Sequence, residues 1–245
     1  MMCVDGEVRL SPLADARGIG YTIHRMANHI IWDWNGTLLD DVGAAVNALN
    51  RMLSARGVAP TTREYYRAHF GFPVRPFYEE LGVDLAHEDW DRICEDFHRF
   101  IGEEPDQRPR ADAAAALERG GALGCRQSIL SALREDLLRR DVSAAGLAGH
   151  FCAIYGVDNL DGATKLSRGL DLMARLRESG EIDHCFFVGD TLHDAEVADA
   201  LGARCILVAG GHQTTERLAA AGRPVADSLS AAIDIIQSEI SKDEE

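Results

Sequence analysis

Acidic side chains stand where short apolar runs end, in two distant parts of the chain. Asp33 follows the apolar start of HIIWDW (residues 29–34), and Asp190 and Asp194 follow the run CFFVG in the segment GDTLHD. Two or more carboxylates in one place can hold a Mg²⁺ ion, which binds a few acid oxygens, waters and substrate phosphate. A carboxylate can also attack phosphorus and form an aspartyl-phosphate. The pattern therefore indicates phosphoryl chemistry with a divalent cation.

Two further polar residues could complete such a site. Ser131 ends the run RQSILS (residues 126–131), and Lys165 stands near the start of a predicted helix. A hydroxyl group and an ammonium group can bind the phosphate oxygens that a metal leaves free. Ser131 could equally be the N-cap of the helix that follows it, so both roles stay open for this residue.

Recurring apolar runs predict the strands that would bring these residues together. Each run is apolar on both faces, which is typical of strands buried on both sides of a parallel sheet. The runs are HIIWDW (29–34), RQSILS (126–131), FCAIYG (151–156), CFFVGD (185–190) and RCILVAG (204–210). Helical patterns separate them, so we predict an α/β fold with a doubly wound parallel sheet. Ligands of such sheets bind beyond the carboxyl ends of the strands, where the candidate residues would meet.

The alternation stops between residues 41 and 110, where one helical pattern follows another. We therefore predict three parts: an N-terminal extension with poorly committed structure (1–28), a core domain (29–40 and 111–240), and a small all-helical cap domain (41–110). A cap inserted after the first strand would overhang the strand ends as a lid. Arg75 in this cap could bind an anionic group of a substrate, or it could be an ordinary solvated side chain.

Composition restricts the partners and the location. The chain has 245 residues and a formal net charge of −15, which argues against binding to nucleic acid or to an anionic membrane. No apolar run approaches the ~18 residues of a membrane span, and residues 1–28 lack the apolar region of a signal peptide. Six cysteines without a C-x-x-C pair fit buried thiols in a reducing compartment. We expect a cytoplasmic monomer or homodimer whose translation starts at Met1 or Met26.

Together these motifs resemble those of the haloacid dehalogenase (HAD) superfamily of aspartate-nucleophile phosphatases. DWNGTLLD (33–40) resembles the first motif, Ser131 the second, Lys165 the third and GDTLHD (189–194) the fourth, in the family's order. The cap position is similar to that of subfamily I, and FGFPVRPFYEELG (70–82) resembles the phosphoglycolate-phosphatase-like branch. The resemblance implies a HAD-type Rossmannoid core and Mg²⁺-dependent hydrolysis of a small phosphorylated metabolite.

The resemblance also implies roles for the residues around the metal. Asp33 would be the nucleophile and a metal ligand, and Asn35 would offer its backbone carbonyl to the metal. Asp190 would ligate Mg²⁺, and Asp194 would ligate it directly or through water.

A second group of residues would hold the substrate. By the same resemblance, Thr37 and Ser131 would orient phosphate oxygens. Lys165 would neutralise charge on the nucleophile and on the phosphoryl group. Arg75 is the candidate from the cap.

Asn35 departs from the family pattern, which has a second Asp two residues after the nucleophile. That Asp protonates the leaving alcohol and then activates water, and such general acid–base catalysis contributes about 10²–10⁴ in rate. Four explanations stay open. The first is a slow enzyme that acts on substrates with good leaving groups. In the second, another acid, such as Asp40, Asp41, His193 or a cap residue, replaces the missing Asp. In the third, the chain binds a phosphorylated metabolite or a protein partner with little turnover, and in the fourth, Asn35-Gly36 deamidates to give an Asp. On the first account, Asn35→Asp should raise turnover.

Overall fold

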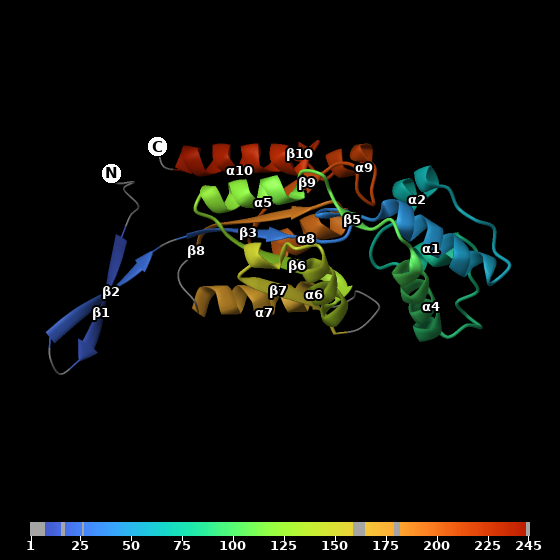
Figure 1. The fold of residues 1–245 in the computed structure, drawn as a ribbon, viewed down its shortest axis with the longest axis horizontal. Coiled ribbons are helices and arrows are strands. Elements are labelled where there is room, and N and C mark those ends of the chain that lie inside the picture. The colour runs from blue at the N-terminus through green and yellow to red at the C-terminus, as the bar shows by residue number, and fades with distance from the viewer. Residues whose placement is uncertain (1–7, 16–17, 26, 159–164, 179–181, 244–245) are drawn as a thin grey trace.

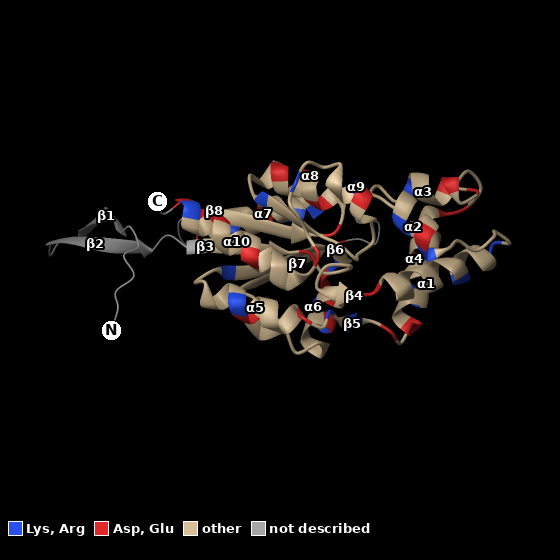
Figure 2. Cartoon of the chain, turned by 90° about the horizontal axis from the view of Figure 1, so that it is seen from above, with Lys and Arg blue, Asp and Glu red and all other residues tan. Residues whose placement is uncertain are grey.

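The computed structural model describes residues 8–15, 18–25, 27–158, 165–178 and 182–243. Met26, the alternative start, lies outside these ranges. Within them, no helix is both long and apolar enough to cross a lipid bilayer. In the view of Figure 2, Lys and Arg are dispersed among Asp and Glu over the helices.

A parallel sheet of six strands, in the order β10-β9-β8-β3-β6-β7, forms the centre of the molecule (Figure 1). The strands are β3 (Ala27–Trp32), β6 (Arg126–Arg134), β7 (Ala153–Val157), β8 (Ile182–Gly189), β9 (Arg204–Val208) and β10 (Val225–Ala226). Every pair of neighbours is parallel. The predicted α/β fold class is thereby confirmed. β10 was not predicted because its two residues carry no periodic pattern.

Helices cover both faces of the sheet, which explains why its strands are apolar on both sides. In β3, Ile30 and Trp32 enter one hydrophobic core and Ile31 enters the other, and all three are fully buried. Helices α5 (Ala113–Ala122), α6 (Glu135–Ala144) and α10 (Leu229–Asp243) contribute to the first core. Helices α7 (Lys165–Glu178), α8 (Leu192–Leu201) and α9 (Thr215–Ala219) contribute to the second. Figure 1 shows α5 and α10 on one side of the sheet and α7 on the other.

Four helices with a hydrophobic core of their own form the cap. They are α1 (Val42–Ser54), α2 (Arg63–His69), α3 (Arg75–Glu80) and α4 (Trp90–Glu103). The chain enters and leaves the cap through β4 (Leu39–Asp40) and β5 (Arg108–Pro109), which pair antiparallel. This short ribbon was not predicted.

Side chains also join the cap to the loop that follows β9. Arg67 of α2 donates to the carbonyl oxygens of Gly211 and Gln213, at 2.8 and 3.0 Å. In return, Arg217 donates to the carbonyl oxygen of Phe70 at 2.7 Å. Because these bonds engage main-chain carbonyls on both sides, they hold the cap against the carboxyl edge of the sheet.

The N-terminal extension differs from the expectation of a poorly committed segment. Strands β1 (Val8–Asp15) and β2 (Gly18–Arg25) pair antiparallel as a hairpin, which Figure 1 shows beyond the end of the sheet that is remote from the cap. The sequence of β1 alternates apolar and polar residues only until Pro12, and a proline within such a run weakens the strand signal.

Candidate active site

The carboxyl edge of the sheet carries two acidic side chains. Asp33 follows β3, and its backbone N–H donates to the carbonyl of Val188 at 2.8 Å, which extends the ladder beyond the strand. Asp190 follows β8 directly. Because β3 and β8 are parallel neighbours, both carboxylates reach the same edge of the sheet.

Asp194 in the first turn of α8 brings a third carboxylate to this edge. One carboxylate oxygen of each of Asp33, Asp190 and Asp194 lies within 4.8 Å of the other two. The three residues are only 5%, 0% and 1% exposed. The residues predicted to bind the metal through carboxylates therefore form one buried cluster.

Lys165 stands between two of these carboxylates. It is the first residue of α7, and its Nζ donates to Oδ1 of Asp33 and to Oδ1 of Asp194, both at 2.6 Å. The lysine is 3% exposed. An ammonium group in this position balances part of the buried negative charge and restrains the Asp33 carboxylate.

The second oxygen of Asp194 holds the start of α8. Its Oδ2 accepts from the backbone N–H groups of Asp190 and Thr191 and from the Thr191 hydroxyl, at 3.1, 2.9 and 2.7 Å. The Thr191 side chain in turn caps the Asp194 N–H, which completes a capping box. A Cβ atom at Gly189 would lie 2.4 Å from the Asp194 side chain, so the glycine of the G-D-x-x-x-D motif permits this close approach.

Burial and neighbouring charges set the ionisation of the cluster. Burial raises the pKa of Asp33 to about 8; the charge of Lys165 opposes this shift, and those of Asp194 and Asp190 add to it. Burial also raises the pKa of Asp190. Burial acts to raise the pKa of Asp194 as well, but the Lys165 ammonium, the Thr191 hydrogen bond and the charge of His193 together hold that pKa below its ordinary value.

Asn35 lies beside Asp41, one of the acids considered as a replacement for the missing one. Its Nδ2 donates to Oδ2 of Asp41 at 2.8 Å, and the N–H of Gly36 donates to Oδ1 of the same carboxylate, also at 2.8 Å. Asp41 is 1% exposed. Of the acids considered as replacements, Asp40 is exposed, and His193 pairs with Glu196 at 3.3 Å. Asp41 is therefore the acid nearest to the amide.

His212 is a site residue that the sequence analysis missed. Two ring contacts hold the imidazole: Nε2 lies 3.2 Å from Oδ1 of Asp41, and Nδ1 lies 2.9 Å from the Tyr66 hydroxyl. The backbone N–H of His212 donates to Oδ2 of Asp190 at 2.6 Å. His212 follows β9 in the segment VAGGH. The rule that polar residues gather at carboxyl ends of parallel strands could have identified it.

We expect His212 to make stability depend on pH. Burial acts to lower the pKa of His212, but the carboxylates of Asp41, Asp190 and Asp33 together outweigh burial and raise that pKa from 6.5 to about 9, with Asp41 contributing most of the rise. The folded protein thus keeps a proton that the unfolded chain loses, so this stabilisation is complete below pH 6.5 and is lost as the pH rises towards 9. Urea unfolding in EDTA should show that the advantage of wild type over His212→Gln shrinks by about 3 kcal/mol between these pH values. An advantage that stays constant with pH would contradict this assignment.

The buried charges of the site do not balance. Four buried carboxylates face one ammonium group and one imidazole; these residues are Asp33, Asp41, Asp190, Asp194, Lys165 and His212. When all six are ionised, an excess of two negative charges remains. Carboxylate oxygens are the ligands that Mg²⁺ prefers, so the residues present fit a divalent cation in both charge and donor type.

Gly36 allows the loop after Asp33 to fold close to this cluster. Its φ angle is +74°, a region that favours glycine. A Cβ atom here would lie 2.3 Å from Oδ2 of Asp190 and 2.4 Å from the His212 ring. The glycine thus supplies both the turn and the space for these two side chains.

Two of the residues that were predicted to bind the substrate do not reach the cavity. Thr37 does not line the cavity; it is fully buried, and its hydroxyl donates to Oδ1 of Asp190 at 2.9 Å, so it positions that carboxylate. Arg75 is exposed, lies over the ring of Trp90 at 5.3 Å and does not line the cavity either. The pattern around Arg75 showed a helix start and could not show on which side of the cap its side chain lies.

Ser131 does lie at the cavity that contains the acidic cluster. It is 1% exposed, and its Oγ accepts from the N–H of Leu133 at 3.1 Å. It is not the N-cap of α6, because β6 continues to Arg134 and the helix begins at Glu135.

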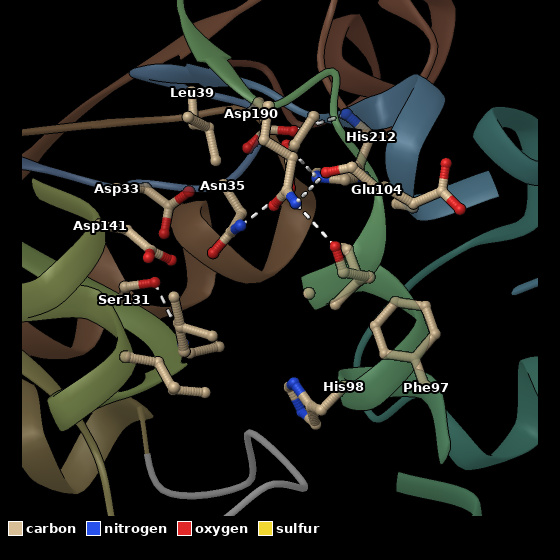
Figure 3. Close-up of a pocket in the computed structure, with 18 of the residues that line it drawn as sticks. Asp33, Asn35, Leu39, Phe97, His98, Glu104, Ser131, Asp141, Asp190 and His212 are labelled. Atoms are coloured by element: carbon tan, nitrogen blue, oxygen red, sulfur yellow. Dashed lines mark hydrogen bonds and ion pairs between the residues drawn. The ribbon is translucent and has the colours of Figure 1, made fainter. Parts of the chain in front are cut away.

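The cavity has a volume of about 560 Å³ and lies between the sheet edge and the cap. Figure 3 shows Asp33, Asn35, Ser131, Asp190 and His212 around it. Lys165 and Asp194 line it too. A phosphoryl group in this cavity could contact the carboxylates, the ammonium group and the serine hydroxyl together.

Comparison with known proteins gives consistent matches. The family of haloacid dehalogenase-like hydrolases matches residues 30–208. A phosphoglycolate phosphatase of Rhodobacter capsulatus is 25% identical over 195 residues, which are 78% of this chain and 88% of that protein. A phosphoglycolate phosphatase of Mesorhizobium japonicum is 26% identical over 191 residues, covering 75% and 83%.

Solved structures are similar in fold. A predicted phosphatase from Clostridium acetobutylicum superposes with a TM-score of 0.73 at 18% identity, over 87% of this chain and 99% of that one. A haloacid dehalogenase-like protein from Agrobacterium tumefaciens has a TM-score of 0.70 at 20% identity, over 87% and 99%.

Proposed function

Because the chain belongs to the haloacid dehalogenase-like hydrolase family, we propose that it hydrolyses phosphate monoesters with Mg²⁺ through an aspartyl-phosphate on Asp33. The observation that carries this proposal is the contact of Lys165 Nζ with Oδ1 of Asp33 and of Asp194, at 2.6 Å each, inside a buried group of three carboxylates. The phosphoglycolate phosphatases that match the chain support a phosphate monoester as the substrate.

Asp33, Asp190 and Asp194 would hold the cation, with the backbone carbonyl of Asn35 as a further candidate. When bound, Mg²⁺ would neutralise charge on the phosphoryl oxygens; charge stabilisation of this kind, together with positioning, supplies most of the catalysis of phosphoryl transfer. The Thr37 hydroxyl donates to Oδ1 of Asp190 and the backbone N–H of His212 donates to Oδ2, so both keep that carboxylate oriented.

In the first step, a carboxylate oxygen of Asp33 attacks phosphorus as the bond from phosphorus to the ester oxygen breaks. Lys165 holds Asp33 in place and lowers its pKa, against the burial that raises it, so it favours the ionised nucleophile. The leaving oxygen takes a proton from solvent, because the Asn35 amide cannot supply one at neutral pH. In the second step, water attacks phosphorus and loses a proton to solvent as the bond to Asp33 breaks, which releases phosphate and restores the free carboxylate.

Hydrolysis of p-nitrophenyl phosphate by purified protein tests this function. We expect release of p-nitrophenol that depends on Mg²⁺ and stops in EDTA. The alternative is a protein that binds a phosphorylated metabolite or a protein partner with little turnover, which the amide at position 35 favours. No detectable turnover at high protein concentration, together with retained binding of Mg²⁺ and phosphate, would overturn the enzyme proposal in favour of that alternative.

The hydrogen bond between Asn35 and Asp41 changes the expectation for Asn35→Asp. The single substitution sets a second carboxylate where the amide donates to Asp41 at 2.8 Å. Two like charges so close raise the pKa of one of them, and the pair then holds the shared proton in the hydrogen bond between them and away from the leaving group. We expect little gain in turnover from it. The double variant Asn35→Asp/Asp41→Asn restores one donor and one acceptor, and should raise kcat by up to about 10²-fold as an acid becomes available.

Steady-state kinetics on an unactivated alkyl phosphate measures this effect, because such a leaving group depends most on protonation. Asp41→Asn alone is the matched control. If the single Asn35→Asp variant is as active as the double variant, the carboxylate of Asp41 does not limit the gain in kcat.

A further inference from the structure

The cap side of the cavity is a largely apolar wall. Its lining includes Leu49, Phe70, Phe72, Val74, Phe97 and Ile101. They come from α1, α4 and the segment between α2 and α3. Figure 3 shows Phe97 on α4, across the cavity from Asp33 and Ser131. The part of a substrate beyond its phosphoryl group would therefore meet apolar and aromatic side chains.

Charges on this wall do not suit an anionic leaving group. Among the described cap residues that line the cavity there is no Lys or Arg; Asp41 and Glu104 are acidic, and His98 is the one basic side chain. On the core side, Arg140 lines the cavity, but its Nε pairs with Asp141, another lining residue, at 2.8 Å. The carboxylate of a short anionic substrate such as phosphoglycolate would thus meet acids, apolar surface and a single histidine on the cap side, while Arg140 on the core side already pairs with Asp141.

The cavity is also larger than a two-carbon substrate needs. Its volume of about 560 Å³ lies within the range that accommodates drug-sized ligands. Filling such a space with apolar groups is favourable because it removes apolar surface from water on both sides.

Asn35 provides a second, independent argument. Without an acid at this position, departure is easiest for a leaving group that needs no proton. A phenol has a pKa near 10, as tyrosine does, far below that of an aliphatic alcohol, so a phenolate leaves more readily unaided.

We propose that the substrate is an aryl phosphate whose leaving group is uncharged and large enough to reach Phe97 and Ile101. This inference rests on the proposed function, and it assigns the leaving-group site to the wall formed by the cap. The phosphoryl group would lie at Asp33 and Lys165, and the ring would pack between Leu133 of the core and Phe97 of the cap, both of which line the cavity.

Binding of non-hydrolysable phosphonates tests the proposal without requiring turnover. The probes are methylphosphonate, benzylphosphonate, naphthylmethylphosphonate and 3-phosphonopropionate, titrated calorimetrically into the full chain with Mg²⁺. We expect affinity to rise at least about tenfold from methyl to naphthylmethyl, as apolar area is buried. 3-Phosphonopropionate, which carries the carboxylate of a phosphoglycolate-like ligand, should bind no better than methylphosphonate.

A pair of variants on α4 tests whether the aromatic ring of the ligand packs against Phe97. Phe97→Ala should weaken naphthylmethylphosphonate about tenfold and leave methylphosphonate unchanged. Phe100→Ala is the matched control, since Phe100 is half-buried on the same helix, does not line the cavity and lies under Arg51 and Arg99; it should change neither affinity.

The proposal is overturned if the four phosphonates bind alike or not at all, if 3-phosphonopropionate binds most tightly, or if Phe97→Ala and Phe100→Ala have equal effects. Because this readout is binding, its failure is distinct from a failure of the p-nitrophenyl phosphate assay. Correct ranking of the phosphonates with no turnover would leave the assigned site standing and remove only the enzymatic step.

Discussion

Asp33→Asn is expected to lower kcat for p-nitrophenyl phosphate by at least about 10⁴-fold, the scale seen when a catalytic nucleophile is removed. An amide oxygen is a poor nucleophile towards phosphorus and cannot form the aspartyl-phosphate. Asp33 is 5% exposed and its Oδ1 accepts from Lys165 Nζ at 2.6 Å, so its carboxylate is held in one position for the attack. Turnover measured under saturating substrate and Mg²⁺ gives the ratio.

The fold should survive this change. Asn has nearly the shape of Asp, and Lys165 keeps its second partner, Asp194, at 2.6 Å. Loss of a carboxylate whose pKa burial has raised to about 8 also relieves repulsion, so the thermal midpoint should stay equal or rise. Asp40→Asn is the matched control, because Asp40 is an exposed acid of the same motif that does not line the cavity. Equal activities of Asp33→Asn and Asp40→Asn would refute the role of Asp33.

Lys165→Met should have the largest effect on stability. The methionine fills similar space but leaves Asp33 and Asp194 without the ammonium that contacts both. Removal of one partner from a buried ion pair costs about 3–5 kcal/mol because the remaining charge is uncompensated. Urea unfolding in EDTA at neutral pH measures this loss, and turnover should fall with it.

Addition of Mg²⁺ should recover part of the lost stability, since a cation at the three carboxylates replaces some of the missing positive charge. Lys242→Met, near the end of α10, is the control; Lys242 is exposed, so its removal should change stability by less than about 0.5 kcal/mol. A Lys165→Met protein as stable as the control would mean that the carboxylates are not held together by this lysine.

The parts of the fold that could be predicted from the sequence are those where a local pattern of apolar residues fits a single kind of element, such as a strand buried on both faces. Ile30, Ile31 and Trp32 are apolar in succession because helices cover both faces of β3. Parallel strands bring their carboxyl ends to one edge, so the meeting of Asp33, Asp190 and Lys165 followed from the order of the runs along the chain. The short pairings β4–β5 and β9–β10 depend on tertiary contacts of two residues and leave no periodic pattern.

The parts of the site that could not be predicted depend on where side chains point. Thr37 is in the expected motif, yet its hydroxyl donates a hydrogen bond to Asp190 and does not face the substrate cavity. Arg75 is in the expected helix, yet it lies over Trp90 and does not line the cavity. Asp41 and His212 are distant in sequence and meet at 3.2 Å, which a one-dimensional pattern does not encode.

Detection of a phosphoryl group on Asp33 would be direct evidence that hydrolysis proceeds through an aspartyl-phosphate. Protein mixed with an aryl phosphate and Mg²⁺ would be quenched in acid within a turnover, digested and mapped by mass spectrometry. We expect phosphorylation at Asp33 in the peptide that contains DWNGTLLD, and no phosphorylation in EDTA or in the Asp33→Asn variant. A protein that turns over substrate while this peptide stays unmodified at every quench time, or carries the phosphoryl group on another residue, would contradict it.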